Sequence, residues 1–240
     1  MRIVAFSDWR RKKAETILNY IRDMNEVPDL ILYAGDDIEV FYGVEDSSES
    51  DDDDLFLHGE ELLKVIEEEY KEEDNYFQKM ASHSKFGLCA VAGNDDTITG
   101  SRLIRGKKVY NVHEDPLILD NIAVIGLEGA ISNIGLLLYT EKEVKRHLDK
   151  MIKKVGNREI ILVSHQPPNN ILDFAIRFGK RHIGSQSLRS FIEKFAPQIK
   201  LVICGHVHSQ GGKLEYLGDV PILNCASHDG KYPWWDKKEP

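Results

Sequence analysis

Short apolar runs recur along the 240-residue chain, and a polar cluster follows each of them at once. The runs span residues 3–6, 30–34, 88–92, 160–163 and 201–204. Continuous runs of this length, rich in β-branched residues or Leu, are typical of strands that are buried on both faces. Helical patterns lie between them, at residues 13–23, 59–80, 141–155 and 187–195. The alternation predicts a layered α/β fold.

Two further segments predict β-hairpins. In each, two apolar pieces flank a turn pair, Asp120-Asn121 in residues 117–126 and Gly218-Asp219 in residues 213–223. Antiparallel strands are therefore expected beside the βα units, which fits two packed sheets flanked by helices. A chain of 240 residues suits one domain with a sizeable core, so we expect a single domain over residues 1–240.

Composition excludes several classes of protein. No apolar run is long enough to span a membrane, and the first residues lack the pattern of a signal peptide, so a cytoplasmic protein is expected. The formal charge of -9 argues against a broad grip on nucleic-acid phosphates. The cysteines stand at 89, 204 and 225 without CxxC spacing, which predicts buried thiols instead of disulfides or a thiolate zinc site.

Two segments are expected to depart from the regular pattern. An insertion at about 43–55 carries the acidic run 45–54, which repels itself and is expected to be a solvated loop instead of a cation site. A short tail at about 229–240 carries Trp234 and Trp235. These rings are expected either to pack back on the domain or to mark a partner surface.

The polar clusters after the apolar runs contain carboxylate, amide and imidazole side chains. In open α/β sheets the residues just beyond the carboxyl ends of the strands share one crevice, so these clusters are expected to converge. Each residue alone has a structural reading, such as a helix cap, a tight turn or a packed histidine. Oxygen and imidazole donors without thiolates suit Mn, Fe, Zn, Ni or Co. The candidate metal ligands are Asp8, Asp36, Asn94, His165, His206 and His208.

Taken in order, these clusters resemble the pattern of the calcineurin-like metallophosphoesterase superfamily, D-x-H, G-D, G-N-H-[DE], a single H and G-H-x-H. The resemblance implies a four-layer αββα sandwich of two packed mixed β-sheets flanked by helices. It also implies two divalent metal ions that hold a hydroxide for attack on a phosphoester. By the same resemblance Asp8, Asp36 and His208 would bind the first metal. The second metal would be bound by Asn94, His165 and His206, together with Asp36, which would bridge the two metals.

The chain departs from the family pattern at two positions, where Arg10 and Asp95 replace histidines. The first metal site loses an imidazole and is expected to bind more weakly than the second. Arg10 could pair with Asp95, or it could clamp the substrate phosphate together with Asn94 while Asp95 becomes an oxygen ligand. Arg10 and Asp95 are the candidate catalytic residues, and Arg10 and Asn94 the candidate substrate-binding residues. An ionised aspartate is a poor acid, so esters with poor leaving groups should react slowly.

These features predict a metal-dependent phosphohydrolase, a phosphodiesterase or phosphomonoesterase that acts on a small molecule. The alternative is a catalytically weakened family member that serves as a binding or scaffold module. A nuclease is less favoured, although Arg102, Arg105, Lys107 and Lys108 could gather near one rim. No membrane contact is expected, and the oligomeric state, the substrate and the native metals are left open.

Overall fold

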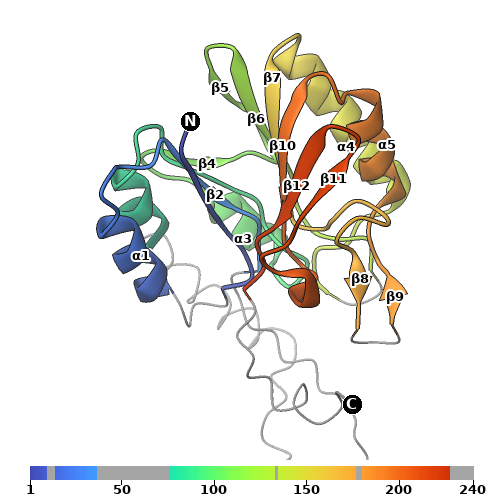
Figure 1. Cartoon of the computed structure of the whole chain (residues 1–240), viewed down its shortest axis with the longest axis horizontal. Helices are drawn as coiled ribbons and strands as arrows, with labels where there is room; N and C mark the ends of the chain where they lie inside the picture. Colours follow the sequence, from blue (N-terminus) through green and yellow to red (C-terminus); the bar gives the residue numbers. More distant parts are fainter. Residues whose placement is uncertain (10–13, 37–75, 133–134, 177–179, 228–240) are drawn as a thin grey trace, which may run out of the picture.

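The computed structural model describes residues 1–9, 14–36, 76–132, 135–176 and 180–227, and two large β-sheets dominate it (Figure 1). The smaller sheet has the order β1-β2-β3-β4, and the larger has the order β11-β12-β10-β7-β6-β5. The smaller sheet consists of β1 (Ile3–Phe6), β2 (Leu30–Tyr33), β3 (Leu88–Ala90) and β4 (Val109–Asn111). The larger consists of β5 (Leu117–Leu119), β6 (Ile122–Leu127), β7 (Glu159–Ser164), β10 (Ile199–Cys204), β11 (Leu214–Leu217) and β12 (Val220–Asn224).

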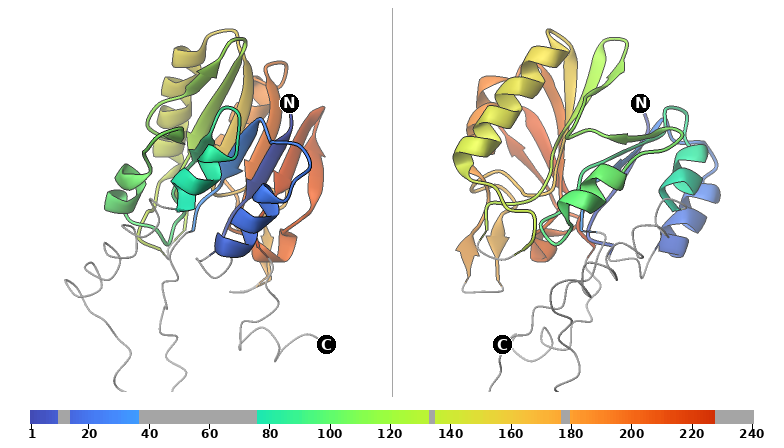
Figure 2. Two further views of the ribbon diagram at one scale, coloured as in Figure 1. Left: turned by 90° about the vertical axis from the view of Figure 1, so that its left-hand side faces the viewer. Right: turned by 180° about the vertical axis from the view of Figure 1, so that it is seen from behind.

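Helices cover the outer faces of both sheets, as Figure 2 shows from two further sides. α1 (Ala14–Arg22) and a helical segment at residues 76–82 pack on the smaller sheet. α4 (Glu141–Val155) and α5 (Gln186–Lys194) pack on the larger one. Helix, sheet, sheet and helix form four layers, so the expected αββα sandwich is confirmed.

Alternation along the strands explains how the layers hold together. In β2, Leu30 and Leu32 point into the apolar layer between the sheets, whereas Ile31 and Tyr33 point toward the helices. β7 repeats the pattern, with Ile161 and Val163 between the sheets. Successive side chains of a strand face opposite sides, so a strand between two apolar layers must be apolar throughout. Each such side chain contributes about 1.5–3 kcal/mol through burial.

The predicted elements fall close to the observed ones. The hairpins β5–β6 and β11–β12 are antiparallel, as expected. One expectation is corrected, because the smaller sheet is parallel throughout and only the larger one is mixed. Each connection between strands of the smaller sheet crosses over instead of turning in a hairpin, and a crossover leaves neighbouring strands parallel. Residues 59–75 of the predicted second helix lie outside the described residues.

Other buried features surround the strands. Trp9 is buried and stacks on Phe77 with ring centroids 5.4 Å apart, so it packs in the core. Cys89 and Cys204 are buried thiols as expected, whereas Cys225 is only partly buried, and burial raises the pKa of all three. No helix in the described part of the chain is long and apolar enough to cross a membrane. The acidic run 45–54 and the tail with Trp234 and Trp235 lie outside the described residues.

Candidate metal centre

The carboxyl ends of strands from both sheets are tied to one another by backbone hydrogen bonds. The Asp8 N–H donates to Gly35 O at 2.8 Å, which joins the ends of β1 and β2. The Gly205 N–H donates to His165 O at 2.9 Å, which joins the ends of β10 and β7. A parallel bridge between Ser7 and Ala226 connects the two sheets. Residues that are far apart in the sequence therefore meet at one edge, as the parallel-strand argument requires.

Four of the candidate ligands form a compact group. Asp36, His165 and His206 each offer an atom within 4.8 Å of the other two. His165 Nε2 lies 2.9 Å from Asn94 Oδ1 and 3.5 Å from Asp36 Oδ1. The His206 ring meets the His165 ring edge-on, with centroids 4.9 Å apart. These are the residues expected at the second metal.

The proton on His165 shows what the group is suited to hold. His165 Nδ1 lies 2.7 Å from the carbonyl oxygen of Ala34, which only accepts, so Nδ1 carries the proton. Nε2 is then the ring atom that faces Asn94 Oδ1 and Asp36 Oδ1. The three atoms face one another as the ligand atoms of one divalent cation would. The set contains carboxylate, amide and imidazole donors, which fits Mn, Fe, Zn, Ni or Co.

Asp8 and His208 form the neighbouring pair. Asp8 Oδ1 lies 3.1 Å from His208 Nε2, and within the described part of the chain this buried oxygen receives no hydrogen bond. The other oxygen, Oδ2, accepts from the Ser7 hydroxyl and from the His206 N–H. Burial raises the pKa of Asp8, but His208, His165 and the Ser7 hydroxyl together hold it well below its usual range. Asp8 therefore offers a charged oxygen beside an imidazole, as two ligands of one metal would.

Three of the candidate ligands have a strained backbone conformation. Asp8, Asp36 and His206 have φ values of 55°, 61° and 67°, in the left-handed region that disfavours side chains. Such residues cost about 1–3 kcal/mol each and cluster at functional sites. Glycines allow the close packing, because a Cβ on Gly93 would lie 1.9 Å from Asp36 Oδ1 and one on Gly205 would lie 2.0 Å from Ser7 Oγ. Three of the eight non-glycine residues with positive φ in the described part of the chain are thus candidate ligands.

Of the two residues that depart from the family pattern, the structure describes only Asp95. Asp95 is buried at the same edge, where its Oδ1 accepts from Asn94 Nδ2 at 2.7 Å. Arg10 lies outside the described residues. Asp96 is buried and accepts from the Gly93 and Asp36 N–H groups at 2.6 and 3.1 Å, so it holds the loops behind the ligands.

Comparison with known proteins agrees with this geometry. A model of the calcineurin-like phosphoesterase family matches residues 1–210. The chain belongs to this family. Membership places it among the phosphoester hydrolases, and the observed four-layer fold is the fold of this family.

Individual phosphoesterase relatives are more distant. An uncharacterized protein of Methanocaldococcus jannaschii is 30% identical over 151 residues, which cover 61% of this chain and 67% of that protein. The probable glycerophosphodiester phosphodiesterase GpdQ of Arcobacter nitrofigilis is 22% identical over 220 residues, 87% of this chain and 66% of the relative's length. The calcineurin-like chain thus spans about two thirds of each.

Solved structures share the phosphoesterase fold. Phosphopantetheinyl hydrolase (PptH) from Mycobacterium tuberculosis superposes with a TM-score of 0.59 and 13% identity, over 100% of this chain and 93% of that one. Another crystal structure gives a TM-score of 0.63 and 18% identity, over 93% and 89% of the two chains. At these identities the likeness concerns the fold alone.

Sequence reasoning missed a second polar pair near this edge of the phosphoesterase fold. Asp173 is 1% exposed, and its Oδ1 lies 2.5 Å from Nδ1 of the half-exposed His182. The pair belongs to the small β8–β9 hairpin (Phe174–Ala175 and Arg181–His182), whose Phe174 O accepts from Ser209 Oγ beside His208. No motif marks either residue, because the contact depends on how the hairpin folds back.

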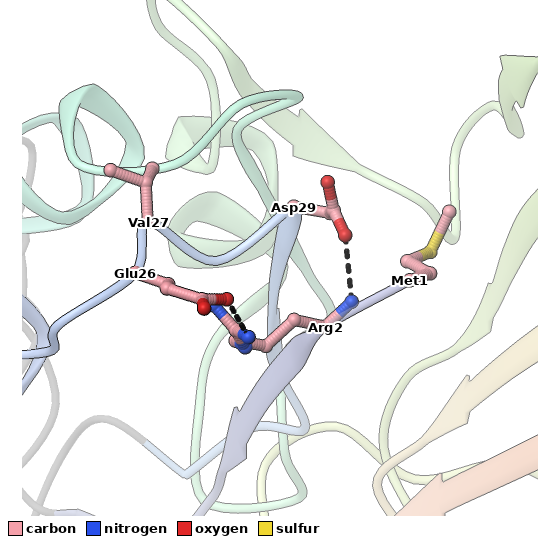
Figure 3. Close-up of a pocket in the computed structure, with 5 residues that line it drawn as sticks. All are labelled: Met1, Arg2, Glu26, Val27 and Asp29. Atoms are coloured by element: carbon pink, nitrogen blue, oxygen red, sulfur yellow. Dashed lines mark hydrogen bonds and ion pairs between the residues drawn. The ribbon is translucent and has the colours of Figure 1, made fainter.

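The hollow in Figure 3 lies at the opposite end of β1 from Asp8. Arg2 lines it, and this residue pairs with Glu26 through its guanidinium and donates from its backbone N–H to Asp29 Oδ2 at 2.7 Å. Its polar groups are thus engaged with one another. The candidate metal centre, and not this hollow, is where the chemistry of a phosphoesterase is expected.

Proposed function

We propose that the protein is a metal-dependent phosphohydrolase that cleaves a small phosphodiester or phosphomonoester at the centre built from Asp8, Asp36, Asn94, His165, His206 and His208. The observation that carries the proposal is the meeting of His165 Nε2 with the Asn94 and Asp36 oxygens at 2.9 and 3.5 Å. Two divalent cations bound there would activate water as the nucleophile and neutralise charge on the phosphate oxygens.

The side chains of the chain itself have distinct tasks in this proposal. Asp36, Asn94, His165 and His206 would hold the second cation, and Asp36 would also serve the first together with Asp8 and His208. The Ala34 carbonyl fixes the tautomer of His165 so that Nε2 faces the centre. The Ser7 hydroxyl and the His206 N–H bind one oxygen of Asp8 and leave the other directed at His208.

The proposal is tested with the purified full chain, stripped of metal and reloaded with Mn²⁺, Co²⁺, Ni²⁺ or Zn²⁺ in turn. Hydrolysis of an activated aryl phosphodiester is expected with at least one of these metals, and no hydrolysis is expected in chelator. Silence with every metal, together with binding of a partner chain, would favour the scaffold alternative.

The two metal sites are expected to differ in affinity. The family pattern places a histidine at the first site where this chain has Arg10, so one imidazole is lost there, while all four second-site residues are in place. Calorimetric titration of the metal-free protein with Mn²⁺ should therefore resolve two classes of site. Two equally tight sites would contradict the expectation.

The chain should prefer substrates whose leaving group needs no proton. Asp95 stands where the family has a histidine, and its carboxylate accepts a hydrogen bond from Asn94 instead of offering a proton. We expect kcat/KM on an activated aryl phosphodiester to exceed that on an alkyl phosphodiester by about 10²-fold or more, the range assigned to general acid catalysis. Similar rates on both would show that an acid is supplied elsewhere.

A small-molecule substrate fits the relatives, one of which is named as a glycerophosphodiester phosphodiesterase and another as a phosphopantetheinyl hydrolase. Nucleic acid is a poor candidate. Lys108 directly precedes β4, at the end of the sheet away from Asn94, and donates to Ser84 O and Lys85 O. Arg105 pairs with Glu114. A cytoplasmic location belongs to the same proposal and rests on the sequence alone.

A further inference from the structure

The contact between Asp95 and Asn94 suggests a role for Asp95 other than proton transfer. Asn94 Nδ2 donates to Asp95 Oδ1 at 2.7 Å, and Asn94 Oδ1 faces His165 Nε2 at 2.9 Å. We propose that Asp95 is a positioning residue that holds the Asn94 amide with its oxygen toward the metal. This inference rests on the proposed function, since it concerns the same centre.

The side-chain amide of Asn94 can still rotate about its terminal torsion, and this rotation decides which atom faces the metal site. The backbone carbonyl of Asn94 accepts from the Leu136 and Leu137 N–H groups at 2.7 and 3.0 Å, so the main chain at Asn94 is held in place. The terminal torsion of an asparagine side chain has two broad, nearly equal settings, which exchange the oxygen and the nitrogen. Only one setting offers an oxygen to a cation.

His165 does not by itself select the setting. Its Nε2 faces Asn94 Oδ1 at 2.9 Å, and a ring nitrogen can either donate to an amide oxygen or accept from an amide nitrogen. A contact on the other side of the amide can therefore decide which atom faces the centre.

Asp95 provides this contact. The turned amide would place its oxygen against Asp95 Oδ1, the atom that accepts from Asn94 Nδ2, and would lose that hydrogen bond. Asp95 is itself well fixed, because it is 5% exposed and its N–H donates to Asp36 Oδ1 at 3.1 Å. One residue thus holds two ligands, Asp36 through its backbone and Asn94 through its side chain.

The expected consequence is a loss of metal affinity when Asp95 is removed. A protein whose binding-competent arrangement is only partly populated binds its ligand more weakly by that fraction. Loss of partners that orient metal ligands typically weakens affinity by about 10–100-fold. For D95A we expect the Mn²⁺ dissociation constant of the tighter site to rise within that range. D95N, which keeps an accepting oxygen, should lose less than D95A.

A kinetic measurement separates positioning from catalysis. If Asp95 acts through Asn94, D95A should need more Mn²⁺ for half-maximal hydrolysis of the aryl phosphodiester but should regain most of the wild-type kcat at saturating metal. A catalytic residue would instead lower kcat at every metal concentration while leaving the metal affinity in place, and that result would overturn the proposal.

The matched background is N94D, because a carboxylate presents an oxygen in either setting and needs no orientation. In that background the further change D95A should leave the Mn²⁺ dissociation constant unchanged or lower it, since it removes a like charge. Calorimetry of the four proteins, namely wild type, D95A, N94D and the double variant, measures this coupling, and thermal denaturation checks that each is folded. An equal loss of affinity from D95A in both backgrounds would overturn the proposal and would instead indicate that Asp95 binds metal itself. Failure of the wild type to bind any of Mn²⁺, Co²⁺, Ni²⁺ and Zn²⁺ would overturn the proposed function as well.

Discussion

Replacing Asp36 with asparagine is expected to lower kcat/KM for an aryl phosphodiester by about 10³-fold or more. The change keeps the shape of the side chain but removes the charge that both cations are proposed to share. Metal ions contribute several kcal/mol of charge stabilisation in such sites, and about 4 kcal/mol corresponds to this factor. Asp36 is buried, and its Oδ1 lies 3.5 Å from His165 Nε2, so the charge is removed from the interior of the centre. The measurements are steady-state kinetics and metal content by mass spectrometry.

Two matched controls separate loss of charge at the centre from general damage. Asp29 lies at the opposite end of β1 and accepts from the Arg2 N–H, so D29N should keep kcat/KM within about twofold. Asp96 holds the Gly93 and Asp36 N–H groups but offers no atom to a cation in the proposal, so D96N should fall between the two. If D36N kept more than a tenth of the wild-type activity, Asp36 would not be the shared ligand.

The local features of this fold could be predicted from the sequence because they depend on short-range chemistry. An apolar run such as residues 30–34 has few alternatives to a buried strand, and β2 covers Leu30–Tyr33. α4 spans Glu141–Val155 as predicted, because Thr140 and Glu143 form a capping box and Gly156 ends the helix. The positions of the candidate ligands follow from the same logic, since each stands directly after a strand.

The contacts between side chains could not be predicted in the same way. The sequence offered Arg10 or the first metal as partners for Asp95, whereas the structure adds a bond to its neighbour Asn94. That bond depends on the turn after β3. The pairing of Asp173 with His182 likewise depends on the β8–β9 hairpin, which the spacing of apolar residues did not predict. Such contacts are decided by backbone geometry at loops, where the pattern of apolar residues carries no information.

A buried polar network beside the metal centre is a further example, and it has a consequence for stability. Glu128 accepts from Tyr139 OH at 2.7 Å and from the Ser101 hydroxyl, and it lies 3.3 Å from His113 Nε2. The His147 ring stacks on His113 with centroids 3.9 Å apart, and His147 Nε2 donates to Gly126 O at 2.8 Å.

Burial lowers the pKa of His113 to about 4, with help from the Lys150 cation. Burial also lowers the pKa of His147 to about 4, with help from the adjacent His113.

The free energy of unfolding is therefore expected to fall as the pH falls from about 6.5 toward 4. Both folded pKa values lie below the value of about 6.5 for a free histidine, so the unfolded chain binds more protons in this range. The stabilisation is complete above pH 6.5, and linkage gives a loss of roughly 2 kcal/mol per histidine between pH 7 and 5. Set against a typical stability of about 5–15 kcal/mol, the loss from two histidines is large. Urea denaturation of the metal-free protein at several pH values measures it.

The variant H147Q isolates the contribution of the stacked pair. Glutamine can donate to Gly126 O as Nε2 does, but it takes up no proton in this range. The loss between pH 7 and 5 should shrink by roughly 2 kcal/mol relative to wild type. Comparison of the two proteins at pH 8, where His147 is neutral, gives the cost of the lost ring contact separately. An unchanged pH dependence in H147Q would mean that the acid sensitivity of the fold arises outside this network.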